Sequence, residues 1–169
     1  KISNYDKSLS DKKLPKITLK KSQRVLCAKS RKNHFEGVLN VLNCFVKLIK
    51  PKVMFMGEKD YQQYFLSRNF ISKYYKTNVY LCRTIRSSNG IALSSRNILL
   101  NNKDLKKCGL IANELLKLKN LLLRMKNNKK VNSKRFKEQI KESRKQLINK
   151  FDIKIEYLEC RNLVNLNTD

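Results

Sequence analysis

Two short polar segments carry residue types that are suited to binding a phosphate group. The first is GEKD at 57–60, which directly follows the apolar run 53–56. A glycine lets a ligand approach the backbone, a helix start presents free N–H groups, and Lys59 adds a full positive charge. Gln63 lies three residues beyond Asp60, so both side chains can project from one helical turn toward one ligand. The pattern therefore favours an anion site, although it also fits a turn capped by Asp60 with solvated charges.

The second segment is LSSRN at 93–97. Paired hydroxyls, backbone amides and a guanidinium in one loop form a good clamp for a phosphate. A polar loop before a helix explains the same residues, and the segment alone leaves both interpretations open. His34 is the only histidine in the chain, which excludes a Ser-His-Asp triad and a histidine-rich metal site.

The elements around the first segment predict an α/β domain with a parallel sheet. Apolar residues recur at a spacing of three to four over 35–50, which indicates a helix that Pro51 ends. The short apolar run 53–56 predicts a strand buried on both faces, and 61–75 returns to helical spacing before a second strand at 79–82. Ligands of such sheets bind beyond the carboxyl ends of the strands, where GEKD lies.

Downstream of residue 83 the pattern predicts a small α+β unit. Residues 83–97 read as a loop with a turn at 87–90, followed by helices over 104–125 and 133–150. The alternation of Ile153, Ile155 and Tyr157 predicts a strand, and Ile17 to Leu19 could form another. We therefore expect two domains, 1–83 and 84–169.

Composition bounds the class of protein without identifying it. The chain has 169 residues, of which 41% are hydrophobic, and its net charge is +26. Such a charge attracts polyanions, but lysine is spread along the whole chain, which favours solvated faces over a dedicated nucleic-acid surface. The five cysteines form no C-x-x-C pair, so we expect reduced thiols in a cytoplasmic protein. No apolar run approaches the length of a membrane-spanning helix.

Three segments in order resemble the pantoate–β-alanine ligase family. They are SRKNHFEGV at 30–38, KPKVMFMGEKDYQQ at 50–63 and GIALSSRN at 90–97, and the resemblance runs from about residue 20 to about residue 160. It implies a partial Rossmann-like nucleotidyltransferase domain that binds ATP and pantoate, followed by a small lid domain. It also implies a cytoplasmic homodimer that joins pantoate to β-alanine through a pantoyl-adenylate, with ATP and Mg²⁺, and no contact with a membrane.

The resemblance can be carried over only where the motifs match. It implies ATP contacts at Gly57, Glu58, Lys59, Asp60, Ile85, Leu93, Ser94, Ser95 and Arg96. It implies a pantoate contact at Gln63 and catalytic roles for Lys59, Ser94, Ser95 and Arg96. It implies no protein ligand to a metal.

The chain also departs from the family pattern. The family's upstream H-x-G-H motif and an upstream glutamine are absent, and His34 does not replace them. We therefore expect an internal fragment that lacks roughly the first third of the enzyme and is inactive alone. Lys32 and Asn33 stand where relatives often have Pro-Gly. A basic nucleic-acid-binding module and another adenylate-forming enzyme of the same fold are the alternatives.

Overall fold

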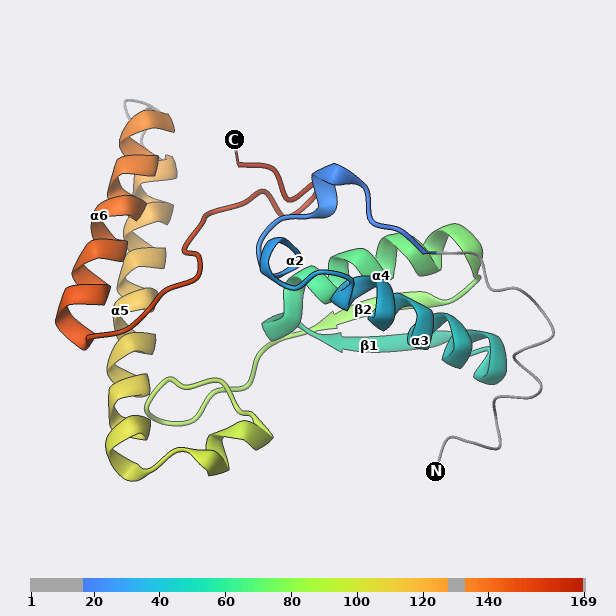
Figure 1. Ribbon diagram of the computed structural model, residues 1–169, viewed down its shortest axis with the longest axis horizontal. Coiled ribbons are helices and arrows are strands. Elements are labelled where there is room, and N and C mark those ends of the chain that lie inside the picture. The colour runs from blue at the N-terminus through green and yellow to red at the C-terminus, as the bar shows by residue number, and fades with distance from the viewer. Residues whose placement is uncertain (1–16, 128–132, 169) are drawn as a thin grey trace. The chain divides into compact units, whose positions relative to one another are not determined.

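The structure is a computed structural model that describes residues 17–127 and 133–168 (Figure 1). The chain divides into two compact units, Lys1–Arg83 and Thr84–Asp169. Each unit has its own helices and buried residues, and each is described here by itself.

The first unit is built around a parallel pair of strands, as the sequence pattern predicts. Its elements are η2 (Lys21–Gln23), α2 (Cys27–Ser30), α3 (His34–Ile49), β1 (Val53–Gly57), η3 (Glu58–Asp60), α4 (Tyr61–Tyr74) and β2 (Asn78–Cys82). The strands pair in parallel register from Val53 opposite Asn78 to Gly57 opposite Cys82. The α/β class is therefore confirmed, whereas residues 17–19 form no strand.

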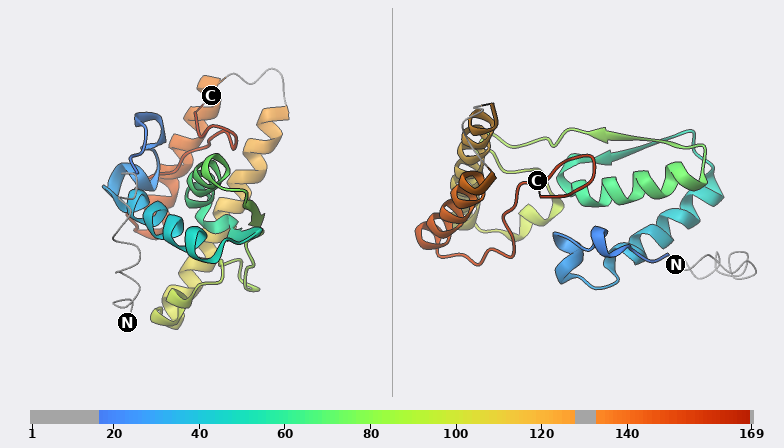
Figure 2. Two further views of the ribbon diagram at one scale, coloured as in Figure 1. Left: turned by 90° about the vertical axis from the view of Figure 1, so that its right-hand side faces the viewer. Right: turned by 90° about the horizontal axis from the view of Figure 1, so that it is seen from above.

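The core of this unit lies between α3, α4 and the segment that precedes α3. Helix α3 buries the apolar face predicted from its spacing and ends before Lys50, which is left-handed at φ 49°, and Pro51. Helix α4 runs along one face of the sheet and contacts α3, β1 and β2 (Figure 2). The buried apolar cluster consists of Leu19, Ala28, Phe35, Leu39 and Leu66.

The prediction that strand β1 is buried on both faces is wrong. Met54 and Met56 are half-buried on one face, whereas Val53 and Phe55 are exposed on the other. Phe55 stacks on Tyr80 with ring centroids 5.9 Å apart and remains 69% exposed. The reason is that α4 covers one face of the sheet, and none of the described residues of this unit covers the other.

The second unit contains a helical hairpin and two irregular segments. Its elements are η4 (Ser95–Leu99), α5 (Asn102–Asn127) and α6 (Ser133–Phe151). Leu118 of α5 and Leu147 of α6 are buried, and the Lys150 Nζ lies 2.9 Å from the Glu114 Oε1. Within 17–127 and 133–168, no helix is both long and apolar enough to cross a membrane.

The strand predicted at residues 153–157 is not formed. These residues are irregular, and the Arg144 Nη2 donates a hydrogen bond to the Ile155 carbonyl oxygen at 2.5 Å. A side chain thus occupies an acceptor that a sheet ladder would use. In the described part of this unit, strand-like pairing is limited to one antiparallel bridge between Arg86 and Ala92.

Candidate active site

The segment 57–60 lies at the carboxyl end of β1, as its position in the sequence predicts. Gly57 is the last residue of the strand, η3 follows, and α4 begins at Tyr61. Gly57 is extended, with φ −76° and ψ 138°, so the turn does not require a glycine. A Cβ built at this position meets nothing within 4 Å. What Gly57 offers to a ligand is therefore open space beside the backbone.

The charged side chains of this segment are exposed. Glu58, Lys59 and Asp60 all face solvent, which leaves the Lys59 ammonium accessible to an anion. Asp60 occupies the N-cap position of α4, but its side chain makes no capping hydrogen bond. The expectation that the Asp60 side chain caps this helix is therefore wrong, although Asp60 occupies the N-cap position. The carboxylate therefore does not compete with a ligand for the first N–H groups of α4.

Tyr61 begins α4 beside the charged segment. Burial raises the pKa of the Tyr61 phenol, Tyr64 raises it further, Arg68 lowers it and Glu58 adds a smaller rise. The two tyrosine rings lie with centroids 5.6 Å apart. Because the pKa lies above its ordinary value of 10.0, the phenol is neutral at physiological pH and keeps its proton as a donor.

The two adjacent glutamines of α4 have different surroundings. Gln62 is 6% exposed, and its Nε2 donates hydrogen bonds to the Val25 carbonyl oxygen at 2.7 Å and the Gln23 carbonyl oxygen at 3.3 Å. Gln63, the predicted ligand residue, is half-buried. Gln62 therefore ties residues 23–25 to α4, a role that the sequence analysis missed. The sequence could have indicated this burial, because Gln62 lies four residues before the apolar Leu66 and therefore shares its face of the helix.

Replacing Gln62 with Leu is expected to lower the free energy of unfolding by about 1–3 kcal/mol, because the carbonyl groups of the half-buried Gln23 and Val25 lose their donor. Gln63→Leu is the matched control, and its effect should stay within about 0.5 kcal/mol. Urea denaturation followed by circular dichroism measures both. Equal losses in the two variants would show that Gln62 does not hold the 23–25 segment in place.

The second polar segment is presented by a tight turn. Arg86 and Ala92 form an antiparallel bridge, and the Leu93 N–H donates to the Ile85 carbonyl oxygen at 2.9 Å. Gly90 has φ +86°, a conformation that favours glycine, and its N–H donates to the Ser87 carbonyl oxygen at 2.9 Å. The structure therefore places Ile85 next to Leu93, although eight positions separate them in the sequence.

The serine-arginine part of this segment begins the short helix η4. The Ser94 Oγ accepts a hydrogen bond from the Arg96 N–H at 3.2 Å, and the Ser94 carbonyl oxygen accepts one from the Asn97 N–H at 3.0 Å. The Asn97 Nδ2 donates to the Ala92 carbonyl oxygen at 3.1 Å. Ser95 and Arg96 are exposed. The backbone is thus held by Ser94 and Asn97, while the Ser95 hydroxyl and the Arg96 guanidinium face solvent.

Helix α5 supports this turn through a glycine. A Cβ built on Gly109 would lie 3.0 Å from the Asn89 carbonyl oxygen and 3.2 Å from the Asn89 Cβ. Gly109→Ala is expected to displace the turn, because an overpacking cost of about 1–3 kcal/mol exceeds the gain of about 1 kcal/mol in helix propensity. We expect faster hydrogen exchange of the Gly90 and Leu93 amides.

The matched control is Gly37→Ala in α3, where an added Cβ meets nothing within 4 Å. That variant should raise the free energy of unfolding by up to about 1 kcal/mol without changing exchange at Gly90. Unchanged exchange at Gly90 in Gly109→Ala would contradict the proposed support by α5.

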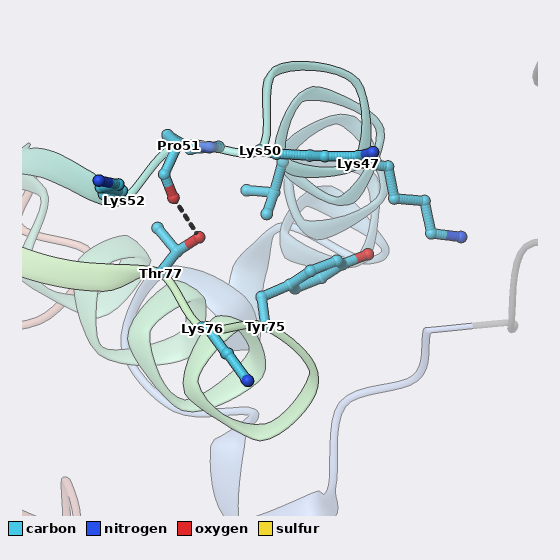
Figure 3. Close-up of a pocket in the computed structure, with 8 residues that line it drawn as sticks. Lys47, Lys50, Pro51, Lys52, Tyr75, Lys76 and Thr77 are labelled. Carbon is cyan, nitrogen blue, oxygen red and sulfur yellow. Dashed lines mark hydrogen bonds between the residues drawn. The ribbon is translucent and has the colours of Figure 1, made fainter.

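A pocket of about 430 Å³ lies at the opposite ends of the strands, as Figure 3 shows. Four of the residues that line it are lysines, at positions 47, 50, 52 and 76. Their side chains point in different directions in Figure 3, and Thr77 donates a hydrogen bond to the Pro51 carbonyl oxygen at 2.7 Å. The carboxyl ends of α3 and α4 also place partial negative charge there. These lysines offset the helix dipoles and do not converge on a single anion.

The predicted site residues fall in both units. The segment 57–63 belongs to the first unit, and residues 85–97 belong to the second. Their convergence on one ligand therefore stays a prediction. In the described ranges, no group of three or more His, Cys, Asp or Glu side chains could hold a metal ion. Free thiols are found at Cys44, Cys82, Cys108 and Cys160.

The comparison with protein families decides the relationship of the chain. A family model described as Pantoate-beta-alanine ligase matches residues 5–169. The chain belongs to this family. It is 42% identical over 110 residues to pantothenate synthetase of Campylobacter hominis, covering 64% of this chain and 40% of that protein. It is 45% identical over 94 residues to pantothenate synthetase of Leptospira interrogans, and this match covers 54% of this chain and 33% of that protein. The chain spans less than half the length of these curated relatives.

Solved structures of the family have the same fold. Pantothenate synthetase from Thermus thermophilus superposes with a TM-score of 0.77 at 21% identity, covering 96% of this chain and 57% of that one. Pantoate-beta-alanine ligase from Francisella tularensis, complexed with beta-gamma ATP and beta-alanine, gives a TM-score of 0.56 at 33% identity. That comparison covers 64% of this chain and 42% of the Francisella chain.

Proposed function

We propose that the protein is an ATP-dependent ligase that condenses pantoate with β-alanine to form pantothenate. The reaction proceeds through a pantoyl-adenylate and releases pyrophosphate and then AMP. The family match over residues 5–169 is the observation that carries the proposal. The exposed cations of the 57–60 and 93–97 segments agree with it, as does the ATP and beta-alanine complex named for the Francisella relative.

In the first step the pantoate carboxylate attacks the α-phosphorus of ATP. Two anions must approach each other, so positive groups and hydrogen-bond donors must offset the charge on the phosphoryl oxygens and on the leaving pyrophosphate. Lys59 supplies a charge at the start of α4, and Arg96 supplies one from η4. The Ser94 and Ser95 hydroxyls add neutral donors. We assign these four side chains to catalysis.

ATP is bound by both polar segments in this proposal. The open space beside Gly57 admits a phosphate close to the backbone, and Glu58 and Asp60 flank Lys59 there. Ile85 and Leu93 lie side by side and are 72% and 56% exposed, so they offer an apolar surface on which a flat adenine ring can pack. Pantoate binds at Gln63, whose amide can both donate to and accept from its hydroxyl and carboxylate groups.

Mg²⁺ fits this site as an ion carried mainly by the triphosphate. Mg²⁺ in nucleotide sites is commonly held by phosphate oxygens, waters and one or two carboxylates. The resemblance implies no protein ligand to this metal, but the exposed carboxylates of Glu58 and Asp60 are the groups in the 57–60 segment that would hold it. When bound, the ion would screen the phosphate charge.

The two units have different tasks in this proposal. Residues 1–83 form the part of the domain that binds ATP and pantoate, and residues 84–169 act as a lid that brings Arg96 to the triphosphate. Closure also excludes water, which would otherwise hydrolyse the acyl-adenylate before the β-alanine amine attacks it. The resemblance further implies a cytoplasmic homodimer, which sedimentation of the full-length protein would test.

The experiment that tests the proposal is exchange of labelled pyrophosphate into ATP by the full-length protein that contains these residues. We expect exchange only when pantoate is present, because the pantoyl-adenylate must form before pyrophosphate can re-enter ATP. Omitting β-alanine should leave the exchange intact, since the amine acts in the second step. Exchange without pantoate, or with an unrelated carboxylic acid in its place, would contradict the proposal.

A further inference from the structure

The loop that carries Arg96 is closed by one side chain. The Asn97 Nδ2 donates a hydrogen bond to the Ala92 carbonyl oxygen at 3.1 Å, across five positions of sequence. Asn97 and Ala92 are both half-buried, so water competes less for this bond than for a bond on an open surface. The backbone N–H of Asn97 donates to the Ser94 carbonyl oxygen at 3.0 Å. The two bonds of Asn97 therefore enclose residues 93–96.

Ala92 is the fixed end of this loop. It pairs with Arg86 in the antiparallel bridge. The Arg86 Nη1 donates to the Gly90 carbonyl oxygen at 3.0 Å, which closes the turn beyond the bridge. The same turn packs against Gly109 of α5. The Asn97 side chain therefore ties the start of η4 to a turn that rests on a long helix.

The Arg96 side chain depends on this loop for its position. Its backbone N–H donates to the Ser94 Oγ at 3.2 Å. Its guanidinium is exposed and pairs with none of the described residues. A long side chain without a partner lies wherever its backbone carries it, and a misplacement of about 1 Å can slow a reaction by about 100-fold. A fixed backbone at 94–97 is thus needed to bring this cation to the same place in every turnover.

We propose that Asn97 is a positioning residue for the adenylation step, which holds the Arg96 backbone in place through the Ala92 carbonyl oxygen. The inference rests on the proposed function, because it takes Arg96 as a catalytic residue. Asn97 contacts no reacting atom in this account. Its bond also fixes the spacing between Arg96 and the apolar pair Ile85 and Leu93, which are joined by a backbone hydrogen bond of 2.9 Å.

The test is a double-mutant cycle in the full-length protein, with pantoate-dependent pyrophosphate exchange as the measured rate. Asn97→Leu keeps the approximate size of the side chain and removes the donor. It should lower the maximal rate by about 10–100-fold and change the KM for ATP by less than about threefold, because a misplaced Arg96 affects the transition state more than substrate binding. In an Arg96→Ala background the same substitution should cost no more than about twofold, since no guanidinium is left to misplace.

Asn101→Ala is the matched control for a purely structural effect. The Asn101 Oδ1 accepts a hydrogen bond from the Asp104 N–H at 2.8 Å at the start of α5, so the variant removes a helix cap. It should lower the midpoint of urea denaturation and leave the exchange rate within about twofold of the parent. An unaltered rate in Asn97→Leu, or a full additional loss in the Arg96→Ala background, would overturn the proposal.

A measurement without substrate separates this inference from the proposed function. Asn97→Leu should lower the hydrogen-exchange protection of the Leu93 and Leu100 amides by about tenfold, whereas Asn101→Ala should leave that of Leu93 unchanged. Unchanged protection in Asn97→Leu would show that the bond does not hold the loop. A parent protein without pantoate-dependent exchange would overturn the proposed function instead. Asn97→Ala should behave like Asn97→Leu, and failure of both variants to fold would make Asn97 a residue of the fold and not a positioning residue.

Discussion

Replacing Lys59 or Arg96 with Ala in the full-length protein is expected to slow pantoate-dependent pyrophosphate exchange by about 10²–10³-fold. The reason is that each variant removes one full charge that offsets charge on the reacting phosphates, and losses of this size follow the removal of a single stabilising donor. Both side chains are exposed, so neither variant should change the free energy of unfolding by more than about 0.5 kcal/mol.

The controls for these variants are lysines of equal charge that lie away from the two segments. Lys47→Ala removes a charge at the amino ends of the strands, and Lys103→Ala removes one from the first turn of α5. Both should keep exchange within about twofold of the parent. A general loss of attraction for ATP would instead slow all four variants alike, which would argue against specific roles for Lys59 and Arg96.

The second large effect is expected at Gln63. Gln63→Ala should lower kcat/KM for pantoate by about 10–150-fold, because a hydrogen bond to a charged ligand contributes about 1.5–3 kcal/mol. The KM for ATP should change by less than about threefold, since Gln63 is assigned to the acid pocket. Steady-state kinetics with each substrate varied in turn separate the two effects.

Asn69→Ala is the control for Gln63, because Asn69 lies on the same helix and is exposed. It should leave both kinetic constants close to those of the parent. Equal losses for pantoate and ATP in Gln63→Ala would favour another adenylate-forming enzyme of this fold, in which Gln63 supports the nucleotide site.

The alternating helices and strands of the first unit could be predicted because each has a strong local pattern. The apolar spacing over 35–50, with Pro51 after it, specifies α3 almost to its ends. The exposure of one face of β1 could not be predicted. A continuous apolar run shows that both faces of a strand are suited to burial, but it does not show whether any residue packs on each face. The exposed Phe55 shows this difference directly.

The failures in the second unit have a similar cause. Alternation at 153, 155 and 157 is a weak signal, and it cannot show that Arg144 takes the Ile155 carbonyl oxygen. Likewise, the support of the 87–90 turn by Gly109 depends on a contact across 20 positions of sequence. Local propensity carries no information on such contacts, which tertiary packing decides.

The candidate site was predictable in its residue types and not in its geometry. GEKD and LSSRN could be recognised from glycine, charge and hydroxyl groups that suit a phosphate. The sequence did not show that Asp60 makes no capping bond or that Gln62 is a structural residue beside Gln63. These differences depend on where neighbouring carbonyl groups lie after folding.

The central claim is that the 57–63 and 93–97 segments bind one triphosphate. A crystal structure of the full-length protein with a non-hydrolysable ATP analogue tests it most directly. We expect the Lys59 Nζ and the Arg96 guanidinium both to lie within about 3 Å of oxygens of the same triphosphate. A structure in which either cation points away from the nucleotide, with no cleft joining the two segments, would contradict the account.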